Sequence, residues 1–187
     1  MMPIPRWIYR YRGVLLIPPL LLVCFFTFRE TESRLAWPVG IITILMGIGI
    51  RVLAQQHLHH KIKARQDLTT TGLYSIIRNP LYVANTLLCL GAVMISEEIW
   101  FVPVMFLYCC GLYSLVVRYE EAHLLKEYGE PYRKYLSEVP RWFPRNLSFW
   151  KGGLVNQYFL YVLIVEGSCL LIIIPYIIKD ILINLHF

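Results

Sequence analysis

Five long apolar runs constrain this chain more than any other feature of its sequence. They cover Val14–Phe28, Trp37–Ala54, Leu81–Ile95, Ile99–Val117 and Tyr158–Ile178. Crossing the hydrocarbon core of a bilayer, about 30 Å thick, takes about 20 helical residues. The first and third runs are short by this measure, so they need flanking residues or a locally thinner bilayer. The pattern predicts an all-α, multi-pass transmembrane bundle of about five spans.

Composition supports a membrane protein and excludes several other classes. Hydrophobic residues make up 57% of the chain and charged residues only 16%, against about 45–50% and about 25% in soluble domains. A soluble globular protein, a disordered protein and a fibrous repeat are therefore excluded. The 187 residues fit a single membrane domain, 1–187. The net charge of +6 is assigned to the cytoplasmic face of that domain, and no nucleic-acid partner is expected.

The distribution of Lys and Arg predicts the orientation of the spans. With the N-terminus in the cytoplasm, fifteen of the eighteen Lys and Arg residues fall on the cytoplasmic side. Because short cytoplasmic loops carry an excess of basic residues, we expect a cytoplasmic N-terminus and an external C-terminus, in a bacterial or archaeal cell membrane. Two polar segments, 55–80 and 118–153, then lie on the cytoplasmic side at either end of a helical hairpin. A site built from both segments is the natural expectation.

Metal-binding and nucleotide-binding patterns in the chain are weak. His57, His59 and His60 lack further ligands nearby, so we interpret them as part of a basic interfacial segment and expect no metal. The five cysteines lie in apolar runs without a CxxC pair, which favours a role as small hydrophobes. Gly47 and Gly49 lie inside a span, where small residues favour close helix packing over nucleotide binding.

The first distinctive motif runs from Thr71 to Tyr82. Asn79 followed by Pro80 predicts an N-cap and a first helical position, so the third span begins at the membrane surface. The exposed N–H groups and positive dipole of such a helix end can hold a carboxylate or phosphate, and Arg78 adds a cation beside it. The alternative interpretation is an ordinary span start with an interfacial Tyr and Arg.

The second motif, Arg118-Tyr119-Glu120-Glu121, follows the fourth run without a helix breaker. The helix is predicted to extend into the cytoplasm as far as Gly129, a C-cap. Glu130-Pro131 then begins another helix, with Tyr132, Tyr135, Leu136 and Val139 on one face. The segment Val139–Pro144 is predicted to be extended and to form a lid over a pocket. The alternative interpretation of the two glutamates is a solvated acidic turn.

The order of these motifs is more specific than any one of them. A Gly-x-Tyr-x-x-x-Arg-Asn-Pro-x-Tyr span start precedes a helical hairpin, Glu-Glu, Tyr-Gly-x-x-Tyr-x-x-Tyr and Val-Pro-Arg-x-x-Pro. This arrangement, over 68–145, resembles the integral-membrane methyltransferases of the isoprenylcysteine carboxyl methyltransferase and phospholipid methyltransferase superfamily. One position departs from the pattern: Asn79 stands where many members have His. Residues 155–187, an extra C-terminal span, lie outside the resemblance.

The resemblance implies S-adenosylmethionine as cofactor and a lipid or lipid-linked methyl acceptor carrying a carboxylate, phosphate or amine. The cofactor-binding residues that it implies are Tyr74, Arg78, Asn79, Pro80, Tyr82, Glu120, Glu121 and Arg141, and those with catalytic roles are Arg118 and Glu121. Catalysis would consist mainly of alignment and exclusion of water. An amine acceptor would also require a base, for which His123 is the candidate.

Two other functions are compatible with the sequence. Sterol reductases share an Arg-x-Pro-x-Tyr span start, although this chain lacks their additional spans, so an NADPH-dependent reductase is the alternative enzyme. The non-enzymatic alternative is a scaffold whose basic face holds anionic lipid.

Glu166 is a carboxylate inside the last apolar run, where an ionised group is unfavourable by about 2.5–3.5 kcal/mol. We expect a buried hydrogen bond to another helix or to a second copy of the chain, with Gly167 and Ser168 allowing close approach. The functional alternative is a polar contact with a substrate head group. A homo-oligomer formed through the spans remains open.

Overall fold

Long α-helices dominate the computed structural model, which describes residues 6–26, 35–64, 68–144 and 155–185. The α-helices are α1 (Arg6–Arg10), α2 (Ile17–Phe26), α3 (Ala36–Ala64), α4 (Pro80–Ile95), α5 (Phe101–Tyr128), α6 (Glu130–Glu138), α7 (Phe159–Gly167) and α8 (Ile174–Leu185). Short 3-10 helices, η1 (Val14–Leu16), η2 (Leu73–Ser75) and η4 (Ser168–Ile173), lie between them. The described residues contain no β-strand, so the predicted all-α class is confirmed.

The helices have the lengths and surfaces of membrane spans. Among the described residues, Ala36–Leu58, Phe101–Tyr128 and Phe159–Lys179 are long and apolar enough to cross a bilayer, whereas Val14–Cys24 and Pro80–Ile95 are shorter apolar helices. Large apolar side chains point outward, such as Leu107 and Ile164, which are 69% and 70% exposed. Such a surface suits lipid, where helices also satisfy every backbone polar group internally.

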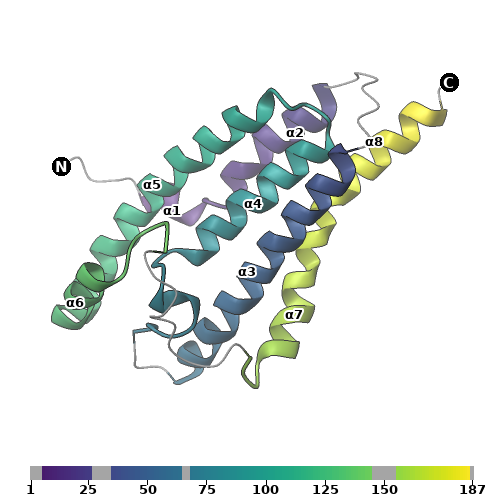
Figure 1. Ribbon diagram of the computed structural model, residues 1–187. Helices are drawn as coiled ribbons and strands as arrows, with labels where there is room; N and C mark the ends of the chain where they lie inside the picture. The colour runs from purple at the N-terminus through teal and green to yellow at the C-terminus, as the bar shows by residue number, and fades with distance from the viewer. Residues whose placement is uncertain (1–5, 27–34, 65–67, 145–154, 186–187) are drawn as a thin grey trace.

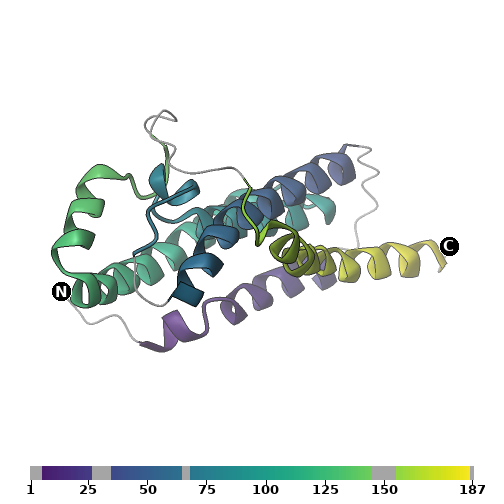
Figure 2. The same cartoon turned by 90° about the horizontal axis from the view of Figure 1, so that it is seen from below.

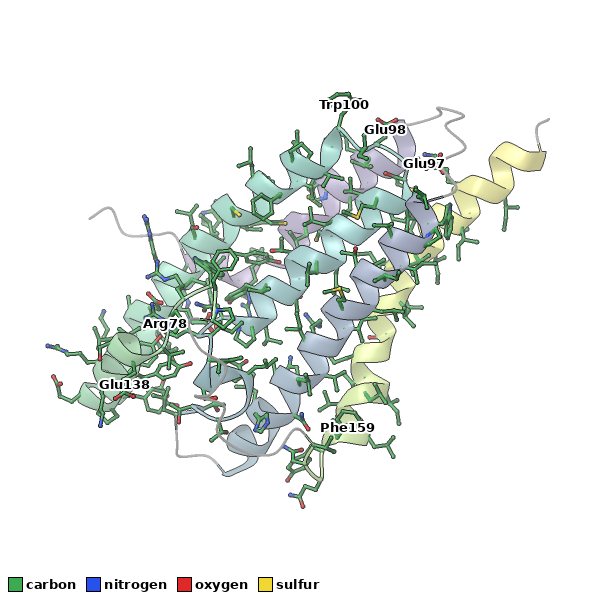
Figure 3. All side chains as sticks on the ribbon, in the orientation of Figure 1. Arg78, Glu97, Glu98, Trp100, Glu138 and Phe159 are labelled. Carbon is green, nitrogen blue, oxygen red and sulfur yellow. The ribbon has the colours of Figure 1, made fainter. Side chains whose placement is uncertain are left out.

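Both views of the ribbon place α6 at one end of the bundle and α8 at the other (Figure 1, Figure 2). Within the bundle, α4 packs against both α3 and α5, while α7 packs against α3. The helical hairpin predicted from the third and fourth apolar runs is therefore confirmed as α4 and α5. Arg78 and Glu138 lie toward one end, whereas Glu97, Glu98 and Trp100 lie at the opposite end (Figure 3). This separation matches the predicted division of the loops; which end faces the cytoplasm remains a prediction.

Glycines allow α3 and α4 to approach each other closely. A Cβ on Gly91 would lie 2.7 Å from the carbonyl oxygen of Gly40, and one on Gly40 would lie 2.8 Å from that of Gly91. A Cβ on Gly47 would lie 3.0 Å from the carbonyl oxygen of Ala84, so the packing interpretation of this glycine is confirmed. Positions 49 and 167 differ from expectation, because a Cβ at either would meet no atom within 4 Å. Neither glycine is needed for close approach.

The last apolar run forms α7, η4 and α8 rather than one regular helix. Its start is fastened to α3: the backbone N–H of Asn156 donates to Oε1 of Gln56 at 3.1 Å, and Nδ2 of Asn156 donates to the Gln56 carbonyl oxygen at 3.1 Å. Its far part packs on α2, where the hydroxyl of the buried Tyr176 donates to the carbonyl oxygen of Leu20 at 3.4 Å. The run therefore docks on two different helices.

We predict that Gly91→Ala lowers the stability of the protein by about 1–3 kcal/mol, because the new methyl group would overlap backbone atoms of α3. The matched control is Gly111→Ala on α5, where a Cβ meets nothing within 4 Å. That change should leave stability equal or raise it by up to about 1 kcal/mol, since alanine favours helix. Thermal unfolding of both variants in detergent measures the difference. Equal effects at the two positions would contradict the proposed importance of the α3–α4 contact.

Candidate functional site

A cavity of about 880 Å³ lies at the end of the bundle that carries Arg78. Its walls come from the chain around α1, from α3, from the segment preceding α4 and from α4, α5 and α6. The two polar segments predicted to meet are thus brought together. The cavity is lined by seven of the residues implied by the resemblance: Tyr74, Arg78, Asn79, Pro80, Tyr82, Glu120 and Glu121.

The start of α4 has the predicted arrangement with one difference. Asn79 is the N-cap and Pro80 the first helical residue, as the sequence indicates. However, the Asn79 side chain does not cap the helix; its Nδ2 donates to the carbonyl oxygen of Arg141 at 3.2 Å. The neighbouring backbone N–H of Arg78 donates to the carbonyl oxygen of Pro140 at 2.9 Å. The segment 139–144, predicted as a lid, therefore docks on the two residues that precede α4.

Glu121 fixes the same segment from the side of α5. Arg141 donates to both carboxylate oxygens of Glu121, with Nε 3.1 Å from Oε1. Nη1 of Arg78 lies 3.4 Å from Oε1 of the same carboxylate, and the side chains of Arg78 and Glu121 are each only 13% exposed. A bidentate arginine–carboxylate pair is among the stronger charged contacts in proteins. Because two cations share one anion, this cluster carries a net positive charge beside the cavity.

Arg78 also carries an unused hydrogen-bond donor. Its Nε is buried, and no atom of the described residues accepts a hydrogen bond from it. Buried donors without partners are unfavourable and usually have an explanation. Together with the net charge of the cluster and the N-terminus of α4, this donor makes the local environment suitable for an anionic group.

Glu120 points in a different direction from its neighbour, as expected because successive helical residues are about 100° apart. The hydroxyl of Tyr82 donates to Oε2 of Glu120 at 2.8 Å, and the Tyr82 ring lies 4.8 Å from the ring of Tyr113, measured between centroids. Among the described residues, no arginine pairs with Glu120. The cavity therefore contains one carboxylate engaged by cations and another held by a phenol.

Helix α6 closes the cavity with an aromatic face. Tyr132 and Tyr135 are buried on it, Leu136 is half-buried and Val139 is buried at its C-cap, which confirms the predicted face of this helix. The hydroxyl of Tyr135 donates to the carbonyl oxygen of Tyr74 at 2.7 Å and so links α6 to the segment preceding α4. Burial raises the pKa of the Tyr74 and Tyr135 phenols above the ordinary value. Both hydroxyls therefore remain protonated at neutral pH, and that of Tyr135 remains a donor.

The N-terminal part of the chain forms a wall that sequence reasoning missed. Tyr9 and Arg12 line the cavity, and the Arg12 guanidinium lies 4.4 Å from the centre of the Tyr9 ring. Nη1 of Arg12 donates to the Tyr9 carbonyl oxygen at 2.9 Å, and the Tyr9 ring lies 5.2 Å from that of Tyr119 on α5. In the sequence, the basic N-terminal residues indicate only the orientation of the spans, and no local motif marks them as site residues.

Arg51 of α3, Asn85 of α4 and Tyr113 of α5 are the lining residues that lie farthest from the polar end along these three helices. The Arg51 guanidinium donates to Asn85 Oδ1, and its Nε lies 2.5 Å from Oε2 of Glu166 on α7. The expected bond from Glu166 to another helix is thus confirmed, within one chain. Sequence reasoning missed Arg51 and Asn85 as site residues; Asn85 could have been noticed as a polar residue in an apolar run, three residues after Tyr82.

Three candidate catalytic or cofactor-binding residues lie outside the cavity lining. Arg118 is exposed, although it was a candidate for a catalytic role. His123, the candidate base, is exposed and lies 3.8 Å from Glu127, measured from Nε2 to a carboxylate oxygen. Arg141 supports the site through Glu121 rather than lining it. Among the described residues there is also no group of three or more His, Cys, Asp or Glu placed to hold a metal; the side chains of His59 and His60 lie outside the described part.

Three curated proteins are similar to about half of this chain. A cobalt-zinc-cadmium resistance protein, CzcN, of Cupriavidus metallidurans is 31% identical over 58% of this chain and 50% of its own length. A nickel-cobalt-cadmium resistance protein, NccN, of Alcaligenes xylosoxydans xylosoxydans is 35% identical over 51% of this chain and 43% of its own. A protein-S-isoprenylcysteine O-methyltransferase of Schizosaccharomyces pombe is 28% identical over 50% and 41%. The chain thus spans about half, or slightly less, of the length of these relatives, and no solved structure matches it.

A family model supplies the assignment. The phospholipid methyltransferase model matches residues 36–131, which comprise α3, the segment preceding α4, the α4–α5 hairpin and the first residues of α6. These elements carry Arg78, Asn79, Glu120 and Glu121, and they form most of the cavity wall. Because the match extends over more than half of the chain, this protein belongs to the phospholipid methyltransferase family.

Proposed function

We propose that this protein is a membrane methyltransferase that moves a methyl group from S-adenosylmethionine to a lipid or lipid-linked acceptor. The observation that carries the proposal is the cavity of about 880 Å³, which joins a cationic end at Arg78 to the carboxylate of Glu120 at one end of an apolar bundle. Its volume lies within the range of about 300–1,000 Å³ that is typical of small-molecule sites. The family match supports methyl transfer as the reaction class.

The residues present fit this cofactor chemically. S-adenosylmethionine carries a carboxylate, an ammonium group, ribose hydroxyls and a purine. The buried Nε of Arg78, without an acceptor in the described residues, suits the carboxylate together with the N-terminus of α4. Glu120 suits the ammonium group or the ribose hydroxyls, and the tyrosines of α6 provide apolar surface with protonated phenols.

The reaction needs alignment more than acid–base chemistry. When bound, the cofactor supplies a methyl group activated by a sulfonium. The contribution of the protein is to hold the two reactants in line and to keep water away from them, since orientation alone can lower a barrier by about 7–11 kcal/mol. The contact of 139–144 with Arg78, Asn79 and Glu121 holds three cavity-lining residues in place and so serves the alignment of the reactants.

A direct assay tests the function. Purified protein is incubated with a radiolabelled methyl donor and total membrane lipid, and the labelled lipids are separated. We expect label in one lipid fraction and measurable binding of S-adenosylhomocysteine by calorimetry. The alternative reductase would instead bind NADPH, and a lipid-binding scaffold would bind neither. Because a ligand at 100 times its dissociation constant stabilises a protein by about 2.7 kcal/mol, thermal unfolding with each ligand separates the three possibilities.

We predict that Glu120→Gln and Glu121→Gln each weaken binding of S-adenosylhomocysteine without unfolding the protein. Hydrogen bonds to charged groups contribute about 1.5–3 kcal/mol, so a loss of about tenfold or more is expected by calorimetry. Glu120→Gln would act by direct contact and Glu121→Gln through the two arginines that it holds. The control is Glu127→Gln, an exposed carboxylate on the same helix that does not line the cavity. Wild-type affinity in both site variants would remove them from the site.

We also predict different outcomes for two substitutions of Asn79. Asn79→His should keep part of the methyl transfer, because an imidazole N–H can donate to the Arg141 carbonyl oxygen as the amide does. Asn79→Leu should lose most of the activity, because it cannot hold the 139–144 segment. Initial rates with the acceptor from the lipid assay provide the comparison. Equal rates for the wild type and the Leu variant would show that the side chain is not used.

A further inference from the structure

The cavity extends into the apolar bundle beyond the residues implied by the family resemblance. Asn85 follows Tyr82 by three residues on α4, so it lies about 4.5 Å farther along the helix, away from the polar end. Arg51 and Tyr113 line the cavity beside it, on α3 and α5. This inner end has different chemistry from the outer end, since both carboxylates of the cavity lining, Glu120 and Glu121, belong to the outer end.

Arg51 presents a cation to the cavity while its counter-ion stays behind it. The Arg51 side chain is 19% exposed and lines the cavity, whereas the Glu166 side chain is 6% exposed and does not line it. The Arg51 guanidinium is held from two sides, by Glu166 of α7 and by Asn85 of α4. A group entering the inner end therefore meets a fixed guanidinium, an amide and a phenol.

Packing alone does not account for this arrangement. Charged residues inside a membrane bundle are unfavourable, and an ion pair can often be replaced by apolar residues without loss of stability. The helix that supplies Glu166 also lies outside residues 36–131, the region that matches the family. The last membrane run of this chain thus adds a counter-ion for a cation that lines the cavity.

We propose that Arg51 is the acceptor-binding residue at the membrane end of the cavity, and that the methyl acceptor is a lipid carrying an anionic oxygen, a carboxylate or a phosphate. This inference rests on the proposed methyltransferase function. The guanidinium holds one oxygen of the anion, and Asn85 and Tyr113 offer further polar contacts. The apolar chains of the acceptor lie toward the membrane interior, and the outer end remains for the cofactor.

The transfer step balances without a base. A lone pair of the second acceptor oxygen forms the new bond to the methyl carbon while the bond between that carbon and sulfur breaks. The electron pair of the broken bond stays on sulfur, so the acceptor becomes an ester with one negative charge fewer and the sulfonium becomes a neutral thioether. No proton moves. This agrees with the described residues that line the cavity, among which there is no histidine and no lysine.

A measurement of lipid binding tests the inference independently of methyl transfer. Myristic acid and dimyristoyl phosphatidic acid are titrated into the detergent-solubilised full chain, and the melting temperature is followed. Methyl myristate and dimyristoyl phosphatidylcholine, which lack a net negative head group, are the controls. Stabilisation by only one of the two acids identifies the carboxylate or the phosphate as the ligand. Equal response to an acid and to its control contradicts the inference.

Two variants distinguish a role of the Arg51 charge in acceptor binding from a structural role of the Arg51–Glu166 ion pair. Glu166→Gln removes the counter-ion but keeps Arg51, with an amide oxygen still able to accept its hydrogen bond. Arg51→Gln/Glu166→Gln removes both charges and leaves no unpaired buried ion. Both lack the ion pair, so a purely structural role predicts the same transfer kinetics in both. Lys126→Gln, an exposed cation on α5 outside the cavity lining, is the matched control for lost charge.

We expect the double variant to fold and to bind S-adenosylhomocysteine as the wild type does, while its KM for the acceptor rises at least tenfold. Glu166→Gln should keep a KM within about threefold of the wild type, because the Arg51 guanidinium and its contact with the acceptor are retained. A tenfold rise in KM corresponds to a loss of about 1.4 kcal/mol. Equal KM values in the two variants would overturn the inference. Failure of the wild type to bind S-adenosylhomocysteine would instead overturn the proposed function, and the lipid titration, repeated on the double variant, would still report on Arg51.

Discussion

The close approach of α3 and α4 is the contact on which the rest of the structure depends. Gly40 and Gly91 allow the two backbones to meet, and Gly47 lies against Ala84 farther along the same interface. Helices in lipid gain little from hydrophobic burial against each other, so their association relies on such packing and on polar contacts. This interface fixes the position of Arg51 on α3 relative to Asn85 on α4. The inner end of the cavity is thus determined by glycines that lie one or more turns away from it.

At the outer end of the cavity, Glu120 and Glu121 have different partners, because adjacent residues of a helix point in different directions. Glu121 is engaged by Arg78 and Arg141, and it joins α5 to the segment 139–144. Glu120 accepts a hydrogen bond from the Tyr82 hydroxyl and keeps a carboxylate inside the cavity. If both carboxylates were paired with arginine, the cavity would offer little to a cationic ligand group. Under the proposed function, the division leaves Glu120 to the ammonium group or the ribose hydroxyls of the cofactor.

Features with a local signal were predictable from the sequence, and features that depend on helix pairing were not. Asn79-Pro80 and Gly129 marked helix boundaries correctly because caps and turns are determined by a few neighbouring residues. The pair Arg51–Glu166 joins residues 115 positions apart, so no local pattern reveals it. Arg118 shows a different limit. Residues three apart on a helix differ by about 60° in direction, which is enough to leave Arg118 exposed while Glu121 is half-buried.

The six residues of η4 set the direction in which the end of the last membrane run faces. A 3-10 helix turns by about 120° per residue, compared with about 100° in an α-helix, so six residues add about 120° of rotation. They also add about 3 Å of length, because the rise per residue is about 2.0 Å instead of about 1.5 Å. Continued as a regular α-helix from Glu166, the run would present a different side to α2, and Tyr176 would not face Leu20. The 3-10 stretch therefore adjusts the rotation of the run, so that Glu166 on α7 pairs with Arg51 while Tyr176 on α8 faces α2.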